Sequence, residues 1–260
     1  MIKAVFFDID GTLLSHKTKR IPDSTIKALK QLKEKGILIF LATGRHSSEM
    51  DDMPIHDVEF DGYITLNGQY CYSENEVLYD LPIEQEDIEN VIAYVDEKKI
   101  PCIFVEDKKM YINFNNEVVE KVQESISTDL PIVGDIHRGH THKIYQVIPY
   151  DIDESGEEMI LSLMPHCKKT RWHPLAIDII PATGGKQNGI EQILKHYHIS
   201  REETMAFGDG MNDMDMLEYV HTGIAMGNAT DDLKEIADDV TTDIDDYGIY
   251  NALKKYGLVD

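Results

Sequence analysis

The 260-residue chain is 42% hydrophobic and 28% charged, so it is long enough for a core domain with a smaller second domain and is unlike a disordered chain. Its 25 basic and 48 acidic residues leave a net charge of −23, which disfavours binding to nucleic acid and to anionic membrane surfaces. Three widely separated cysteines are typical of reduced thiols, and the longest apolar run, residues 37–42, is too short to cross a bilayer. We therefore expect a soluble cytoplasmic protein, a monomer or weak homo-oligomer, that binds neither nucleic acid nor membranes.

The first 80 residues alternate strand-like and helix-like patterns. An apolar run at 4–7 predicts a buried strand, and a following helix with apolar residues three apart is predicted to end at Gly36. Further buried strands are predicted at 37–42 and 62–66. A strand, a helix and a strand at this spacing form a βαβ unit. Its two strands are parallel and are joined by a right-handed crossover.

From about residue 81 the βαβ alternation stops. A hairpin and several helices follow, without that alternation, and this predicts an α+β domain. Its elements are predicted at 84–99, 102–106, 110–114, 117–127, 143–149, 154–164, 167–172 and 175–180. After Gly184-Gly185 the first pattern resumes, with elements at 187–196, 204–207, 214–219, 222–226, 231–237 and 248–256. We therefore predict the fold class α/β, a doubly wound, Rossmann-like parallel-sheet core at 1–81 and 185–260, with an inserted α+β cap domain at 82–184.

Polar side chains follow the predicted parallel strands at their carboxyl ends. In chain order they are Asp8 and Asp10, Thr43, Asn67, and Asp209 and Asp213. Ligands of open α/β sheets bind at this edge. Carboxylates crowded there would repel one another unless a cation lay among them, and an all-oxygen set with few protein ligands suits Mg²⁺. Lys186, which follows the insertion, and the Thr43 hydroxyl would complete a phosphate cradle.

Each of these groups of polar residues is short, and each could instead be a solvated turn after a strand. An EF-hand calcium loop is excluded, because the remaining ligands and the glycine are missing after Asp209 and Asp213. Gly185-Lys186 is not a P-loop, since Gln187 replaces Ser or Thr, and 208–210 lacks the third glycine of a dinucleotide fingerprint. The order of the pieces along the chain favours a single site.

In that order the motifs resemble those of the haloacid dehalogenase (HAD) superfamily, and most closely its Cof-type phosphatases. The four motifs are Asp8-Ile9-Asp10-Gly11-Thr12-Leu13, Ala42-Thr43-Gly44-Arg45, Lys186, and Gly208-Asp209-Gly210-Met211-Asn212-Asp213-Met214. The resemblance covers the whole chain and includes the segment 223–229. It departs from the family pattern locally, because Gln187-Asn188 stands where a Lys-Gly pair is expected.

The resemblance implies a role for each motif residue. Asp8 would attack phosphorus to form an aspartyl phosphate, and Asp10 would protonate the leaving oxygen and then deprotonate the hydrolytic water. The ligands of Mg²⁺ would be the Asp8 side chain, the Asp10 backbone carbonyl and Asp209, with Asp213 orienting this metal shell. The phosphoryl oxygens would be held by Thr43, the backbone of Gly44, Lys186 and Asn212.

Three further groups of residues have two interpretations each. Arg45 would meet either a substrate anion or an acidic neighbour. The histidines His137, His140 and His142 would bind a metal or lie in a hydrated loop. Trp172 and His173 would contact the substrate or pack at a strand end.

The sequence thus predicts a Mg²⁺-dependent phosphatase that hydrolyses small phosphomonoesters, such as sugar phosphates, through an aspartyl phosphate. The alternatives are a phosphomutase of the same superfamily and a non-catalytic metabolite-binding protein on this fold. Loss of Asp8 or Asp10 would mark the latter, and both are present. Because the insertion separates Thr43 from Lys186, we expect it to cap the site and to limit the partner to a small phosphorylated metabolite.

Overall fold

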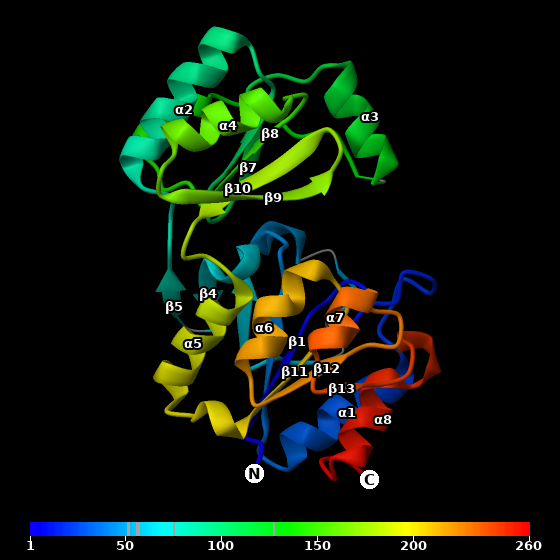
Figure 1. Cartoon of the computed structure of the whole chain (residues 1–260). Coiled ribbons are helices and arrows are strands. Elements are labelled where there is room, and N and C mark those ends of the chain that lie inside the picture. Colours follow the sequence, from blue (N-terminus) through cyan, green and yellow to red (C-terminus); the bar gives the residue numbers. More distant parts are fainter. Residues whose placement is uncertain (51–52, 56–57, 75, 127) are drawn as a thin grey trace. The chain divides into compact units, whose positions relative to one another are not determined.

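The computed structural model describes residues 1–260 apart from 51–52, 56–57, 75 and 127, and apart from the side chain of Trp172. The chain divides into two compact units, which are visible in Figure 1. Unit 1 comprises Met1–Asp80 and Gly185–Asp260, and unit 2 comprises Leu81–Gly184. Unit 2 is therefore an insertion between the two chain segments of unit 1.

Unit 1 is built on an eight-stranded sheet with the order β13-β12-β11-β1-β2-β3-β4-β5. Its strands are β1 (Ala4–Phe7), β2 (Leu38–Ala42), β3 (Gly62–Thr65), β4 (Tyr70–Tyr72), β5 (Val77–Asp80), β11 (Thr204–Gly208), β12 (Thr222–Ala225) and β13 (Asp239–Val240). The strands from β13 to β3 pair in parallel, whereas β4 and β5 add an antiparallel edge. The predicted α/β fold with a parallel central sheet is confirmed, and the edge hairpin is an element that the sequence analysis did not predict.

Helices connect these strands. The α-helices of unit 1 are α1 (Asp23–Glu34), α5 (Lys186–Tyr197), α6 (Met214–Tyr219), α7 (Asp231–Ile236) and α8 (Gly248–Lys255). Its 3₁₀ helices are η1 (Ser47–Glu49), η2 (Leu66–Gly68), η4 (Arg201–Glu203), η5 (Met211–Asp213) and η6 (Ile244–Asp246). Helix α1 packs with α8, and α5 packs with α6. Gly36 follows α1 with a φ of +74°, a conformation that suits the predicted glycine cap.

The central strand β1 is buried along its whole length. Phe6 stacks on Phe40 of β2 with ring centroids 5.0 Å apart, and Phe7 stacks on Phe207 of β11 at 5.2 Å. Such pairs add to the burial of apolar area that stabilises a parallel sheet covered on both faces. The strand that leads into Asp8 is therefore held firmly at the centre of the unit.

The edge of the sheet at which β1, β2 and β11 end carries the polar residues of interest. Strand β1 lies between β2, which follows it in the sequence, and β11, which comes from the second segment of unit 1. This position is a topological switch point, where open α/β sheets bind their ligands. Asp8, Thr43 and Asp209 directly follow β1, β2 and β11 respectively, so the sheet brings them to one edge.

Unit 2 contains a five-stranded antiparallel sheet with the order β7-β6-β8-β10-β9 and a hydrophobic core of its own. Its elements are α2 (Gln85–Lys98), β6 (Cys102–Val105), β7 (Met110–Ile112), α3 (Glu117–Ser125), η3 (Ile136–His140), β8 (Gln146–Pro149), α4 (Glu154–Leu163), β9 (Cys167–His173) and β10 (Ala176–Pro181). The hairpin of β6 and β7 agrees with the prediction. Ser127, at the predicted end of the helix that begins at Glu117, lies outside the described residues. In the described part of the chain, no helix combines the length and apolar character needed to cross a membrane.

Candidate active site

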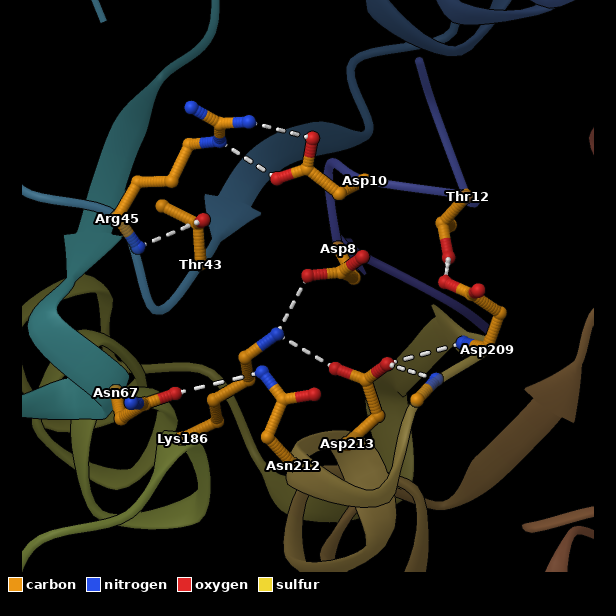
Figure 2. A network of polar contacts seen from close by, with 11 residues as sticks. Asp8, Asp10, Thr12, Thr43, Arg45, Asn67, Lys186, Asp209, Asn212 and Asp213 are labelled. Atoms are coloured by element: carbon orange, nitrogen blue, oxygen red, sulfur yellow. Dashed lines mark hydrogen bonds and ion pairs between the residues drawn. The ribbon is translucent and has the colours of Figure 1, made fainter. Parts of the chain in front are cut away.

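Lys186 lies at the centre of a polar network in unit 1 (Figure 2). Its side chain is 0% exposed, and Nζ donates to Asp8 Oδ1 at 2.6 Å and to Asp213 Oδ1 at 2.5 Å. Burial alone would lower the pKa of Lys186, but Asp213 and Asp8 raise it on balance, so the side chain remains an ammonium. A buried charge of this kind is tolerated because both partners are oppositely charged and within hydrogen-bond distance.

Two of the three carboxylates that lie close together here, Asp8 and Asp213, bind this single ammonium. Oxygens of Asp8, Asp209 and Asp213 lie within 4.8 Å of one another. Burial and the charge of Asp213 raise the pKa of Asp8 to about 8 although Lys186 opposes the shift, and burial raises the pKa of Asp209 to about 6. The cluster thus has too little positive charge and offers only oxygen ligands, so it could hold a divalent cation, which would lower both pKa values again.

Asp213 uses both of its oxygens within the protein. While Oδ1 accepts from Lys186, Oδ2 accepts the backbone N–H groups of Asp209 and Gly210, each at 2.9 Å. The side chain therefore fixes the loop that carries Asp209. This geometry supports the orienting role that the family resemblance implies for Asp213.

The loop after β1 approaches Asp209 very closely. Thr12 Oγ1 donates to Asp209 Oδ1 at 2.9 Å, and a Cβ atom at position 11 would lie 2.2 Å from Asp209 Oδ2. Gly11 also has a φ of +90°, so glycine is required there both by space and by backbone conformation. Asn228 Nδ2 donates to the Gly11 carbonyl at 2.8 Å and holds this loop in place. Sequence reasoning gave neither Thr12 nor Asn228 a role, although both lie within segments of the resemblance.

The Thr43 loop lies beside the amide side chains of two asparagines. Thr43 Oγ1 accepts the Arg45 N–H at 3.1 Å, so the hydroxyl hydrogen can be donated to a ligand. Asn67, in the left-handed conformation with a φ of 51°, donates its N–H to the Thr43 carbonyl at 3.0 Å. Its Oδ1 accepts from Asn212 Nδ2 at 3.5 Å and would lie 3.0 Å from a Cβ atom at Gly44. The sequence analysis noted Asn67 only as a polar strand end, and the structure places it next to Asn212 and Gly44.

The Arg45 side chain pairs with acidic neighbours, as one of the two interpretations from the sequence predicts. Its Nε and Nη2 donate to the two carboxylate oxygens of Asp10 at 2.6 and 2.8 Å, and its Nη1 lies 3.7 Å from Glu49 Oε1. Figure 2 shows the Asp10 carboxylate directed at Arg45, whereas the Asp8 carboxylate is directed at Lys186. The Asp10 side chain is therefore outside the carboxylate cluster that could hold a metal.

The remaining candidates lie in unit 2. His137 Nε2 is 3.0 Å from Asp96 Oδ2, and its ring stacks on His140 at 5.6 Å. The group of possible metal ligands found in the described part of the chain is that of the three aspartates, and it includes none of these histidines. His173 Nδ1 accepts the Leu175 N–H at 3.1 Å at a strand end, and the Trp172 side chain lies outside the described residues.

Comparison with known proteins gives consistent matches. A family model described as haloacid dehalogenase-like hydrolase matches residues 5–253. The chain is 37% identical over 264 residues to YkrA, a candidate phosphatase of Bacillus subtilis (strain 168), with 99% of this chain and 98% of YkrA covered. Among solved structures, the HAD subclass IIB sugar phosphatase BT4131 is 40% identical with a TM-score of 0.83, and 99% of this chain and 100% of that one are covered. BT1666 from Bacteroides thetaiotaomicron, described among the phosphatases of the same superfamily, is 34% identical with a TM-score of 0.91, and the coverage is 100% and 96%.

The chain therefore belongs to the haloacid dehalogenase-like hydrolases, as one of their Cof-type phosphatases. It is a phosphoric monoester hydrolase. The family expected from the sequence motifs is thereby confirmed.

Proposed function

We propose that this enzyme hydrolyses phosphate monoesters of small metabolites, with sugar phosphates as the foremost substrate class, and that Asp8 is its nucleophile. The observation that carries the proposal is the position of Asp8. It follows the central strand at the switch point, accepts from Lys186 at 2.6 Å, and belongs to the carboxylate cluster with Asp209 and Asp213. The 40% identity to the sugar phosphatase BT4131 supports the substrate class.

The reaction would proceed in two displacements. In the first, a carboxylate oxygen of Asp8 bonds to phosphorus while the bond from phosphorus to the leaving oxygen breaks. In the second, water bonds to phosphorus and the bond to Asp8 breaks, which releases orthophosphate. The ammonium of Lys186, the hydroxyl of Thr43 and the amide of Asn212 would hold the phosphoryl oxygens and stabilise their charge in both steps.

Asp10 would carry the protons. It would give one to the leaving oxygen and take one from the attacking water. Arg45 donates one hydrogen bond to each oxygen of its carboxylate, and each oxygen keeps a further lone pair with which Asp10 could take part in either transfer. Arg45 would then act on the reaction through Asp10.

The residues of the cluster fit Mg²⁺ as the cofactor. The carboxylates of Asp8 and Asp209 would hold it, together with the Asp10 backbone carbonyl that the family resemblance implies, and Asp213 would keep the Asp209 loop in place. When bound, the cation would supply the positive charge that lets a carboxylate approach a phosphate dianion.

We also propose that residues 82–184 cap the site. The support is the order of segments along the chain, because the insertion enters after Thr43 and returns directly before Lys186. A cap would exclude water during the chemistry and would admit only small phosphate esters.

Orthophosphate release tests the proposed function. The wild-type protein and Asp8→Asn are compared, in the presence of Mg²⁺, on hexose phosphates, nucleotides, flavin mononucleotide and pyridoxal phosphate. We expect release by the wild type, with the sugar phosphates among the best substrates, and none by the variant. Conversion of a sugar phosphate without comparable orthophosphate release would indicate the phosphomutase alternative instead, and an inert protein would overturn the proposal.

A further inference from the structure

Helix α5 begins with Lys186, yet no side chain of its own caps the amino end. The N-cap residue is Gly185, with φ 153° and ψ 154°, a conformation open almost only to glycine. The first N–H groups of a helix have no partner within it and need one from elsewhere. In α5 that partner comes from a different helix.

Asp215, in the first turn of α6, takes the place of the missing cap. Its Oδ2 accepts the N–H of Gln187 at 3.2 Å. A Cβ atom built on Gly185 would lie 2.3 Å from the same oxygen, so the carboxylate fills the space that an N-cap side chain would use. A carboxylate at this end of a helix also interacts favourably with the helix dipole.

Two residues of one short segment therefore hold Lys186 from both ends. Asp213 accepts from the Lys186 ammonium at 2.5 Å, and Asp215 binds the backbone amide of the residue that follows Lys186. The Lys186 side chain is fully buried and extends from the helix backbone to Asp8, where its Nζ lies 2.6 Å from Oδ1. A shift of the first turn of α5 would move the ammonium relative to Asp8.

The first turn of α5 is also closely packed against neighbouring elements. A Cβ atom at Gly68 would lie 1.9 Å from the Gly185 carbonyl oxygen, and one at Gly189 would lie 2.5 Å from Ile64 Cγ2. The first turn of α5 thus rests directly on β3 and η2. This packing limits movement toward the sheet, whereas Asp215 supplies a directional polar contact at the helix end.

We propose that Asp215 is a positioning residue for the phosphatase reaction, which sets the ammonium of Lys186 against Asp8 by capping α5 from α6. The inference rests on the proposed function, because there Lys186 holds the phosphoryl group. Asp215 binds the backbone amide of Gln187 and would therefore act through Lys186.

Substitutions of Asp215 provide the first test. Asp215→Ala should lower kcat/KM about 10- to 100-fold, mainly through kcat, whereas Asp215→Asn keeps an acceptor oxygen and should stay within about threefold of the wild type. The control is Asp153→Ala, which removes the cap of α4 in unit 2, where Asp153 Oδ1 accepts the Gly156 N–H at 2.8 Å. We expect the control to lower thermal stability without changing kcat.

A double-mutant cycle then tests whether Asp215 acts through Lys186. In a Lys186→Ala background, or in Lys186→Met if the alanine variant does not fold, Asp215→Ala should change the residual rate less than twofold. An equally large loss in both backgrounds would overturn the proposal, as would an Asp215→Ala enzyme within twofold of the wild type.

Hydrogen exchange of the Gln187 amide gives a readout that needs no activity. It should be at least tenfold faster in Asp215→Ala than in the wild type and in Asp153→Ala, and unchanged exchange would overturn the proposal. If the wild-type protein releases no orthophosphate from any ester, the proposed function fails, and the exchange of this amide still decides whether Asp215 caps α5.

Discussion

Arg45 binds both carboxylate oxygens of Asp10, with Nε 2.6 Å from Oδ2 and Nη2 2.8 Å from Oδ1. Two parallel hydrogen bonds of this kind fix the plane of a carboxylate as well as its position. Arg45 follows β2 and Asp10 follows β1, so this pair joins the loops after two neighbouring strands. The proposed proton carrier is therefore held by a residue of the second motif.

We predict that Arg45→Ala lowers kcat about 10- to 100-fold and leaves KM within about threefold. Asp10 would lose its alignment, whereas the substrate would lose no contact. Arg45→Lys keeps the charge but cannot form the paired hydrogen bonds, so its kcat should lie between those of the wild type and Arg45→Ala. Steady-state kinetics on a sugar phosphate measures this, with the exposed Arg20→Ala as the matched control. A rise in KM as large as the fall in kcat would show instead that Arg45 binds the substrate anion.

Asp8→Asn should abolish turnover and leave the fold intact. The amide is nearly isosteric with the carboxylate but cannot serve as the nucleophile. Its neutrality relieves the crowding with Asp209 and Asp213, while Lys186 keeps Asp213 as a partner, so the melting temperature should change by only a few degrees. Asp129→Asn, at an exposed position of unit 2, is the control for the chemistry of the substitution. Residual activity above a few per cent of the wild-type rate would exclude Asp8 as the nucleophile.

Mg²⁺ should both activate the enzyme and stabilise it. A ligand that binds only the folded state adds RT ln(1 + [L]/Kd), which is about 2.7 kcal/mol at a hundredfold excess over Kd. Calorimetry with and without Mg²⁺ should show this shift for the wild type and a much smaller one for Asp209→Asn. Full activity in excess EDTA, with an unchanged melting temperature, would contradict the proposed metal site.

Glu106 in unit 2 should make a contribution to the free energy of unfolding that is lost at acidic pH. Its side chain is 7% exposed, and its two oxygens accept from Arg138 Nε and Nη2 at 2.8 Å each. Burial alone would raise the pKa of Glu106, but the hydrogen bonds from Arg138 and the positive charge of Arg138 lower it on balance. Because the folded-state pKa is the lower one, this stabilisation is present above the unfolded-state pKa of about 4.5 and is lost as the pH falls through the folded-state value.

Glu106→Gln should therefore destabilise the protein by roughly 2 kcal/mol at neutral pH and by less at acidic pH. Urea unfolding between pH 3 and pH 7 measures this dependence, and Glu158→Gln, exposed on α4, is the control. An equal destabilisation at all pH values would mean that the charge of Glu106 does not matter.

If residues 82–184 cap the site, the enzyme should act on free metabolites and leave folded phosphoproteins untouched. We expect kcat/KM for a hexose phosphate to exceed that for phosphoserine in a folded protein by at least about a hundredfold, because only the small ester fits under a cap. Both substrates are measured under matched conditions with Mg²⁺. Equal or greater efficiency on the phosphoprotein would show that the insertion does not restrict access.

The local sequence pattern was sufficient to predict the strands and helices that carry the motifs. The apolar run at 4–7 corresponds to β1, and the helix predicted at 214–219 corresponds to α6, because burial on both faces of a parallel strand and helical periodicity are both visible in a short window. The hairpin of β4 and β5 was missed. These strands are short, and they depend on pairing with β3, where Tyr63 stacks on Tyr72 at 5.0 Å.

The sequence by itself determined the family, the order of the motifs and the kinds of residue available for chemistry. The tertiary structure alone decided which of these residues are partners, because the pairing of β1 with β2 and β11 brings together groups far apart in the chain. Thr12 and Asp209 are 197 residues apart, and Asp8 and Lys186 are 178 residues apart. The capping of α5 by Asp215 and the binding of Asp10 by Arg45 likewise follow from packing between elements, which no local spacing of residues encodes.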